Sequence, residues 1–278
     1  MRLLVTGSRG QLGLALQRAA AEAGHEFSGY DLPELDITDP TAVRAAVARV
    51  RPDAIVNCAA YTAVDAAEAD EARALAVNGA AVAGLAAAAD EAGALLVQIS
   101  TDFVFDGAAT RPYREDDPPH PISAYGRTKL AGEHAARRAQ RHLIVRTAWL
   151  FGDGANFVAA IRRQLDAGAT ELRVVGDQRG CPTYATDLAG AVIVLLEAGT
   201  EGIVHVVNAG SASWREFAVE IVRQLGVAAE VVPISTADAD RPAPRPAYSV
   251  LDASRFRGIV GADLPPWQDA LARWLAAE

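Results

Sequence analysis

The sequence contains almost no lysine. Among its 26 basic residues, Lys129 is the single lysine and all the others are arginine. Cysteine is also scarce. Cys58 and Cys181 are the only two, and neither lies near a histidine cluster or a second cysteine at metal-ligand spacing. We therefore expect two reduced, structural thiols, no cysteine-based zinc site and no other bound metal.

Long uncharged apolar runs are absent as well. Although 51% of the residues are hydrophobic, no stretch approaches the roughly 18 apolar residues without charge that a membrane span needs. The opening residues, 1–7, run directly into a glycine turn, which leaves no room for an export signal. These features predict a cytoplasmic protein with no membrane partner.

The sequence also lacks a positive net charge. Its 26 basic and 35 acidic residues give a formal charge of −9. This balance argues against nucleic acid and against an acidic membrane surface as partners. A small anionic ligand in a local pocket remains compatible with it.

Short apolar runs alternate with alanine-rich stretches through the first half of the chain, which is typical of a parallel sheet with crossover helices. Strands are expected over residues 2–6, 26–30, 53–58, 94–99 and 143–147, and helices over 11–24, 41–50, 68–91 and 124–139. This pattern predicts an α/β fold, a Rossmann-type doubly wound parallel sheet.

The second half of the chain is less regular. Further strands are expected over 172–175, 203–207 and 230–234, and helices over 185–198, 213–225 and 267–277, with a proline-rich segment at 241–246. We assign residues 1–150 and parts of 180–208 to the Rossmann domain. Residues 151–179 and 209–278 would mainly form a smaller C-terminal lobe.

A glycine-rich turn joins the first strand to the first helix. Gly7, Gly10 and Gly13 have GxxGxxG spacing, which permits a tight turn and brings a pyrophosphate close to the helix N-terminus. Gln11 and Leu12 would then begin that helix. A lone glycine triplet is weak evidence, because a βα turn that binds nothing explains it too.

The end of the second strand gives this turn a context. Asp31 lies where an acidic side chain would accept a hydrogen bond from an adenosine ribose, or it is an ordinary turn residue. Arg9 could instead hold a 2′-phosphate, so NADH and NADPH both remain open. Asp36 and Ile37 could border the adenine or form a plain turn before a helix.

Small residues end the third strand, at the sheet edge where open α/β folds bind ligands. Ala59 and Ala60, followed by Tyr61, would let a cofactor lie against the backbone. Alanine is common throughout the chain, so this pair alone carries little weight.

Tyr125 and Lys129 carry the strongest chemical signal. Their i, i+4 spacing places them on one helix face, where a fixed ammonium would bring a phenol pKa near 10 toward the working range of a proton donor. Thr101, at the end of the fourth strand, could contact the same carbonyl oxygen. The alternative is a pair that merely decorates a helix. Chance places the one lysine four residues after one of six tyrosines only roughly 2% of the time.

With these motifs in hand, the chain resembles the extended short-chain dehydrogenase/reductases, and within them the dTDP-4-dehydrorhamnose reductase family. The likeness runs from Arg2 to about Trp274. It rests on the motifs at 10–13, 59–68, 100–107, 125–129, 146–149, 177–183 and 245–252.

The resemblance implies an NAD(P)H-dependent oxidoreductase in which the smaller lobe binds a dTDP-sugar. The implied catalytic residues are Thr101, Tyr125 and Lys129. The implied cofactor contacts are Gly7, Arg9, Gly10, Gln11, Leu12, Asp31, Asp36, Ile37, Ala59, Ala60, Tyr61, Tyr125 and Lys129. The implied sugar contacts are Thr101, Asp102 and Trp149. Asn156, Phe157 and Arg245 are expected as nucleotide contacts through aromatic stacking and charge. Read alone, Trp149 would more often be a core residue.

The resemblance further implies reduction of the C4 keto group of dTDP-4-dehydro-L-rhamnose to dTDP-L-rhamnose with NADPH or NADH, in dTDP-rhamnose biosynthesis. Two alternatives stay open. One is a ketoreductase for another nucleotide-activated deoxysugar, and the other is a non-catalytic regulatory relative, against which the intact Thr101, Tyr125 and Lys129 speak.

One departure from the family concerns assembly. Some bacterial members join two subunits through magnesium held by glutamates, and the matching positions here are Ala15 and Thr186. A monomer or a homodimer without a metal bridge is therefore expected.

Overall fold

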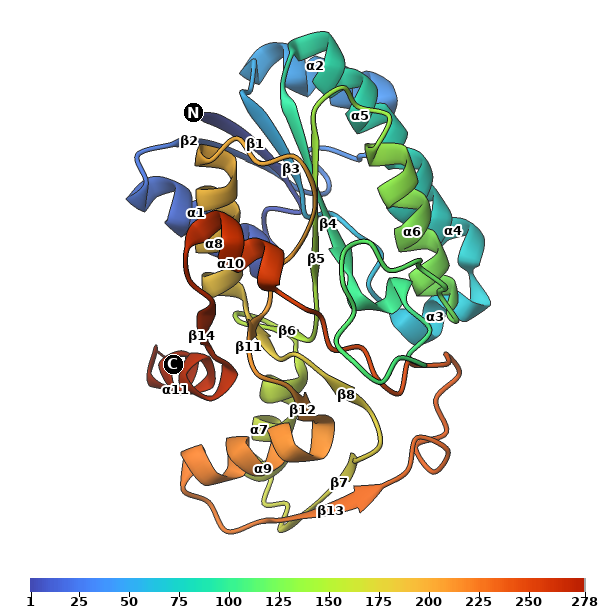
Figure 1. The fold of residues 1–278 in the computed structure, drawn as a ribbon, viewed down its shortest axis with the longest axis vertical. Coiled ribbons are helices and arrows are strands. Elements are labelled where there is room, and N and C mark those ends of the chain that lie inside the picture. The colour runs from blue at the N-terminus through green and yellow to red at the C-terminus, as the bar shows by residue number, and fades with distance from the viewer. Residues whose placement is uncertain (278) are drawn as a thin grey trace.

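The computed structural model describes residues 1–277. A six-stranded sheet forms its centre, and every neighbouring pair of strands is parallel. Its strands, in spatial order, are β10 (Gly202–His205), β5 (His142–Thr147), β4 (Leu95–Thr101), β3 (Ala54–Asn57), β1 (Arg2–Thr6) and β2 (Glu26–Tyr30). The doubly wound parallel sheet predicted from the sequence is confirmed (Figure 1).

The strand order reverses between β1 and β3, because β2 lies on one side of β1 and the later strands lie on the other. In open α/β sheets such a reversal leaves a crevice at the carboxyl ends of the two central strands. The glycine turn after β1 and the small residues after β3 both lie at this point. Topology therefore fixes where a ligand is expected.

Alternating strand residues feed two cores, one on each face of the sheet. Leu3 and Val5 pack with α1 (Gln11–Glu22), α8 (Ala185–Glu197) and α10 (Ser254–Val260). On the other face, Leu4 packs in a core that α2 (Pro40–Val50), α5 (Ala81–Ala92) and α6 (Ala124–Ala136) share. Figure 1 shows these two helix groups on opposite sides of the strands.

The predicted helix over 68–91 is divided in the structure. α3 (Val64–Ala69) ends at Asp70, whose side chain caps α4 (Glu71–Leu75) by accepting from the Arg73 amide, and a π-helical turn (Ala76–Ala80) then leads into α5. The predicted helix is confirmed over most of its length, as the continuous segment Glu71–Ala92, and only its first residues belong to α3. The capping carboxylate supplies the physical reason for the break.

The segment Glu71–Ala92 is long and apolar enough to cross a membrane by length and composition alone. Half of its most apolar window is buried inside the protein, where α5 contributes to the core on one sheet face. It behaves here as a covering helix of the sheet.

The smaller lobe lies below the sheet in Figure 1 and has its own core, which includes Phe151, Phe217 and Trp274. Its helices are α7 (Phe157–Asp166), α9 (Trp214–Leu225) and α11 (Trp267–Ala277). Its short strands are β6 (Leu150–Phe151), β7 (Glu171–Val175), β8 (Arg179–Gly180), β9 (Thr183–Tyr184), β11 (Asn208–Ala209), β12 (Ala212–Ser213), β13 (Glu230–Ile234) and β14 (Leu264–Pro266).

The element positions suggest how the chain divides. α8 and β10, within residues 180–208, lie with the sheet. α10 also packs there through Phe256, although it follows elements of the smaller lobe. We propose a Rossmann domain that adds residues 254–260 to the predicted segments.

A buried ion pair ties α6 to the sheet. Glu133 and Arg146 are both inaccessible to solvent, and the Arg146 guanidinium donates two hydrogen bonds of 2.8 Å to the Glu133 carboxylate. The Ser100 hydroxyl of β4 donates to the same carboxylate at 2.5 Å. Phe105 lies beneath the guanidinium, 5.1 Å from its central carbon. Helix α6 is thus joined to β4 and β5 by side chains that water does not reach.

Removing one member of this pair should be costly. We expect Glu133→Gln to lower the free energy of unfolding by about 3–5 kcal/mol, because it leaves the Arg146 charge buried without a counter-ion. Glu71→Gln is the matched control. It breaks an exposed pair with Arg127 and should cost less than about 1 kcal/mol. Urea unfolding measures both losses of free energy. Equal losses in the two variants would contradict a buried, uncompensated charge on Arg146.

Candidate active site

The glycine turn is shaped by close packing against β3 and α1. Gly7 has φ +66°, and a Cβ there would stand 2.6 Å from the Ala59 nitrogen. A Cβ on Gly13 would stand 2.4 Å from the Gly7 carbonyl oxygen. Only glycine fits at either place. The turn therefore delivers the first amides of α1 to the carboxyl edge of the sheet, as an anion site requires.

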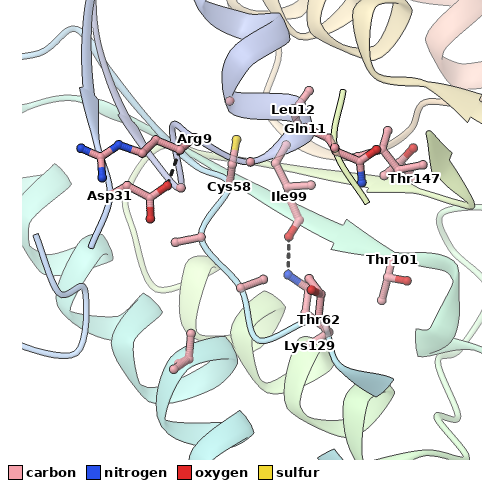
Figure 2. A pocket seen from close by; sticks show the side chains of 18 of the residues that line it. Arg9, Gln11, Leu12, Asp31, Cys58, Thr62, Ile99, Thr101, Lys129 and Thr147 are labelled. Carbon is pink, nitrogen blue, oxygen red and sulfur yellow. Dashed lines mark hydrogen bonds between the residues drawn. The ribbon is translucent and has the colours of Figure 1, made fainter. Parts of the chain in front are cut away.

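A cleft of about 680 Å³ opens at this edge. Most of the predicted site residues line it, namely Gly7, Arg9, Gly10, Gln11, Leu12, Asp31, Asp36, Ile37, Ala59, Ala60, Thr101, Tyr125, Lys129 and Trp149. Figure 2 shows Arg9 and Asp31 at one end of the cleft and Thr101 and Lys129 toward the other. The cleft therefore fits an elongated ligand.

Asp31 and Arg9 are tied to each other in a way the sequence did not indicate. The Asp31 carboxylate accepts from the backbone amides of Arg9 and Leu32, each at 2.9 Å. The Arg9 guanidinium pairs with Glu34 and donates to the Leu32 carbonyl. Asp31 thus helps to hold the glycine turn, in addition to any contact it makes with a ligand.

Asp36 and Tyr61 also have structural partners. Hydrogen bonds from the Thr38 hydroxyl and amide hold the pKa of Asp36 below its ordinary value. Tyr61 does not line the cleft. Its backbone amide and carbonyl are both bound by Asn78, which the π-helical turn presents and which also donates to the Thr128 hydroxyl on α6. π-Helical turns often occur at functional sites, and this one fixes the loop after β3 against α6.

Lys129 is buried, with 4% of its surface exposed. Its ammonium donates to the Ile99 carbonyl of β4 at 2.7 Å (Figure 2). Burial lowers the pKa of Lys129 to about 8, against a smaller opposing effect of the Glu133 charge. The lone lysine is therefore a fixed cation at the cleft wall that titrates not far above neutrality.

Tyr125 departs from the sequence-based expectation. Burial raises its pKa to about 12, a hydrogen bond with Thr101 opposes that rise, and the Asp102 charge adds to it. Lys129 is not among these influences, since its ammonium is directed at the Ile99 carbonyl. The expectation that Lys129 brings the Tyr125 pKa toward neutrality is therefore not met in this structure. A phenol with this pKa carries its proton at neutral pH and is ready to donate it.

Asp102 is not placed as a substrate contact would be. Only 1% of its surface is exposed, and its carboxylate accepts from Thr101 and from Ser249. Burial raises its pKa to about 6. No local pattern indicates the Ser249 partner, which lies 147 positions away.

Two buried polar atoms in the cleft wall lack a protein partner, among the residues that the structure describes. They are Gln11 Oε1, at the start of α1, and Thr147 Oγ1, at the end of β5. Buried polar groups are nearly always hydrogen-bonded. Together with the glycine turn, these atoms fit a polar, elongated ligand such as a dinucleotide.

A second cavity, of about 530 Å³, lies between the sheet and the smaller lobe. Phe157 and Arg245 line it, and Trp149 lines both cavities. Trp149 has φ +47° and stacks on Trp214 with ring centroids 3.5 Å apart. Arg245 donates to Asp65 at 3.0 Å. The two cavities therefore meet at the Trp149 ring.

Asn156 has a capping role instead of lining either cavity. Its side chain accepts from the Ala159 amide at the start of α7 and donates to the Gly152 and Gly154 carbonyls. A contact of Asn156 with a nucleotide stays a prediction without support from this geometry.

The cysteines are free thiols, as predicted. Cys58 lines the cleft, but burial raises its pKa to about 12, so it is a poor nucleophile. Within residues 1–277, no three His, Cys, Asp or Glu side chains are grouped to hold a metal ion.

The chain is similar to known proteins along its whole length. A family model described as the RmlD substrate binding domain matches residues 1–278. The probable dTDP-4,6-dihydroxy-2-methyloxan-3-one 4-ketoreductase of Streptomyces antibioticus is 47% identical over 277 residues, covering 98% of this chain and 93% of the relative. The dTDP-4-dehydrorhamnose reductase of Streptomyces griseus is 46% identical over 279 residues, covering 97% and 91%.

A solved structure is similar along the whole chain. It is the dTDP-4-dehydrorhamnose reductase of Bacillus anthracis in complex with NADP. The TM-score is 0.96 at 37% identity, and the match covers 100% of this chain and 99% of that one. The similarity thus includes the smaller lobe as well as the sheet.

The lowered pKa of Lys129 predicts a dependence of stability on pH. Between pH 8 and the ordinary lysine value of 10.5, the unfolded chain binds a proton that the folded protein has released, so raising the pH favours the folded state. The stability of the wild type relative to Lys129→Met should rise across this window, by at most about 1.4 kcal/mol per pH unit. Urea unfolding at several pH values measures it. A constant difference would show that Lys129 titrates normally.

Proposed function

This chain belongs to the RmlD substrate binding domain family, and we propose on that basis that it reduces the C4 keto group of dTDP-4-dehydro-L-rhamnose to dTDP-L-rhamnose, using NADPH or NADH. The family resemblance drawn from the sequence motifs is confirmed. The chain is an NAD(P)H-dependent oxidoreductase, as its relatives named dTDP-4-dehydrorhamnose reductase are.

One observation carries the proposal. Thr101, Tyr125 and Lys129 lie at the end of the cleft where Trp149 separates it from the second cavity. A dinucleotide in the first cavity and a nucleotide-sugar in the second would bring their reactive ends together beside the Tyr125 hydroxyl. Such positioning accounts for much of the rate enhancement in two-substrate reactions.

The cleft residues fit a nicotinamide dinucleotide. Gly7, Gly10 and the first amides of α1 would hold the pyrophosphate, and Asp31 with Arg9 would meet the adenosine ribose. Gln11 Oε1 and Thr147 Oγ1 offer buried acceptors that the protein leaves unpaired. When bound, the reduced coenzyme supplies the hydride.

We assign the remaining chemistry to three side chains. Tyr125 donates its proton to the keto oxygen, and its raised pKa keeps that proton in place at neutral pH. Lys129, fixed on the Ile99 carbonyl, offers further hydrogens to the ribose of the nicotinamide. Thr101 lies beside Tyr125 and orients the same oxygen. Trp149, Phe157 and Arg245 would contact the dTDP-sugar from the second cavity.

A second candidate is a ketoreductase for another dTDP-linked deoxysugar. The relative from Streptomyces antibioticus, whose name gives a different dTDP-sugar, is as similar as the reductase from Streptomyces griseus. Both names specify a dTDP-sugar and a reduction. The sugar contacts of the second cavity would decide between the two substrates.

We further propose a nucleotide-sugar enzyme with no nucleic-acid or membrane partner, acting in the cytoplasm as a monomer or as a homodimer without a metal bridge. The net charge of −9 supports the absence of nucleic-acid and acidic-membrane partners. Ala15 is buried against the sheet with 2% exposure, so the position offers no metal ligand.

The decisive experiment is a reduction assay with dTDP-4-dehydrorhamnose and each coenzyme, beside a panel of other dTDP-4-ketosugars. Turnover highest with the rhamnose precursor supports the first candidate, and turnover highest with another sugar supports the second. If the protein binds coenzyme but reduces no keto-sugar, both candidates are wrong and the remaining hypothesis is a non-catalytic regulatory protein of the same fold.

Tyr125→Phe removes the proton donor and keeps the ring. Turnover should fall by about 10² or more, the usual scale for general acid catalysis, while coenzyme affinity survives. Tyr184→Phe, in the core of the smaller lobe, is the control and should stay within a few-fold of the wild type. Near-normal turnover of Tyr125→Phe would mean that another group protonates the oxygen.

Asp31→Asn should weaken NADH more than NADPH. The carboxylate accepts a hydrogen bond from a ribose hydroxyl of NADH and repels the 2′-phosphate of NADPH, whereas the asparagine oxygen can still accept from the Arg9 amide that Asp31 binds in the glycine turn. The ratio of the two dissociation constants should therefore shift by about tenfold against NADH. Fluorescence titration measures both dissociation constants. Glu26→Gln, an exposed change on β2, the strand that precedes Asp31, controls for general charge. An unchanged ratio of the two constants would move the ribose site elsewhere.

A further inference from the structure

Asp102 is a buried carboxylate beside the proposed proton donor. It follows Thr101 directly at the end of β4. The Thr101 hydroxyl donates to Asp102 Oδ1 at 3.0 Å, and the Ser249 hydroxyl donates to Oδ2. Asp102 therefore lies between a residue of the reaction centre and a residue of the second cavity.

The groups around Asp102 leave its charge uncompensated. Its titratable neighbours are Tyr125 on α6 and Cys181 beside β8, and both have a pKa of about 12 and are neutral in the working range. Thr101 and Ser249 contribute hydroxyls only. A buried carboxylate in this setting changes its protonation near pH 6.

Two groups compete for the single hydrogen of the Thr101 hydroxyl, the Asp102 carboxylate and the Tyr125 oxygen. A hydroxyl has one hydrogen and accepts at two lone pairs. The Phe103 amide donates to Thr101 Oγ1 at 3.2 Å and uses one lone pair. When Asp102 is ionised, it takes the hydrogen. Thr101 then has one lone pair left, which can accept from the Tyr125 hydroxyl but has no hydrogen to offer a keto oxygen.

Protonation of Asp102 reverses this arrangement. The carboxyl can now donate its own hydrogen to the second lone pair of Thr101. Both lone pairs are then filled, and the Thr101 hydrogen is free to point toward Tyr125 and the reacting oxygen. Negative charge develops on that oxygen during reduction, and a donor aimed at it stabilises the transition state.

We propose that Asp102 is a positioning residue that controls whether Thr101 donates to the reacting oxygen, with Ser249 as its tether to the substrate segment. The proposal rests on the ketoreductase function proposed above. It replaces the direct sugar contact expected for Asp102 from the sequence, because the carboxylate is buried and both its oxygens have partners inside the protein.

Ser249 connects this control to the second cavity. It lines that cavity together with Arg245 and Pro246, and its amide donates to the Arg179 carbonyl at 2.8 Å. Its hydrogen bond favours the charged form of Asp102 and so lowers the Asp102 pKa. Removing the Ser249 hydroxyl should therefore move the protonation of Asp102 to higher pH.

The test is the pH profile of turnover with a saturating keto-sugar nucleotide, between about pH 5 and 7.5, below the range in which Lys129 titrates. Wild-type turnover should fall as the pH rises through about 6. Ser249→Ala should move this fall up by about one pH unit. Asp102→Asn, which cannot ionise, should show no such fall and should exceed the wild-type rate at pH 7.5. Ser254→Ala, an exposed serine five positions further on, should keep the wild-type profile.

A second measurement needs no turnover. The carboxyl band of Asp102, identified in the infrared spectrum by its loss in Asp102→Asn, should titrate near pH 6 in the wild type. Its midpoint should rise in both Ser249→Ala and Thr101→Val, because each removes a hydrogen bond to the charged form. With a merely structural role for Asp102, the midpoint would still move in these variants, but the turnover profile would not move with it.

The outcomes separate the two proposals. A wild-type protein that binds coenzyme but reduces no keto-sugar contradicts the proposed function. A midpoint that Thr101→Val leaves in place, or a turnover profile that Asp102→Asn shares with the wild type, overturns the role of Asp102 alone.

Discussion

The site depends on the buried pair between Glu133 and Arg146. Tyr125, Lys129 and Glu133 are spaced four residues apart and lie on one face of α6, so the anchor at Glu133 sets where the other two stand. Arg146 belongs to β5 and Ser100 to β4. These strands therefore hold the helix at a fixed rotation, with the Lys129 ammonium against the Ile99 carbonyl one residue before Ser100. Without this anchor, α6 could rotate, and neither the Lys129 ammonium nor the Tyr125 hydroxyl would have a fixed position.

Much of this arrangement could be predicted from the sequence, because it is local. A strand, a glycine turn and a helix follow each other within 22 residues, and Tyr125 and Lys129 are one helical turn apart. The strands of the sheet were located to within two residues for the same reason. The topology of the sheet then brings together Gly7, Ala59 and Thr101, which are distant in the chain.

What the sequence could not predict depends on contacts between distant residues. The partner of Asp102 is Ser249, and the partners of Asp31 include a backbone amide of the glycine turn. The pKa of Tyr125 follows from burial, which no i, i+4 spacing reveals. α7 went unpredicted although its apolar residues recur at helical spacing, and Asn156, expected at a ligand, caps that helix instead. Local sequence patterns identified the chemically important side chains, whereas tertiary packing determines their hydrogen-bond partners and pKa values.

The stack of Trp149 on Trp214 has an optical consequence. Two indoles with centroids 3.5 Å apart and planes inclined by only 4° are coupled electronically, and the pair therefore absorbs and emits differently from two separate rings. Trp267 and Trp274, the other tryptophans, are buried in the core of the smaller lobe and away from such changes. Any molecule that displaces Trp149 from its neighbour would alter the near-ultraviolet circular dichroism of the protein. The wall between the two cavities thus contains its own chromophore, and ligand entry can be followed without a label.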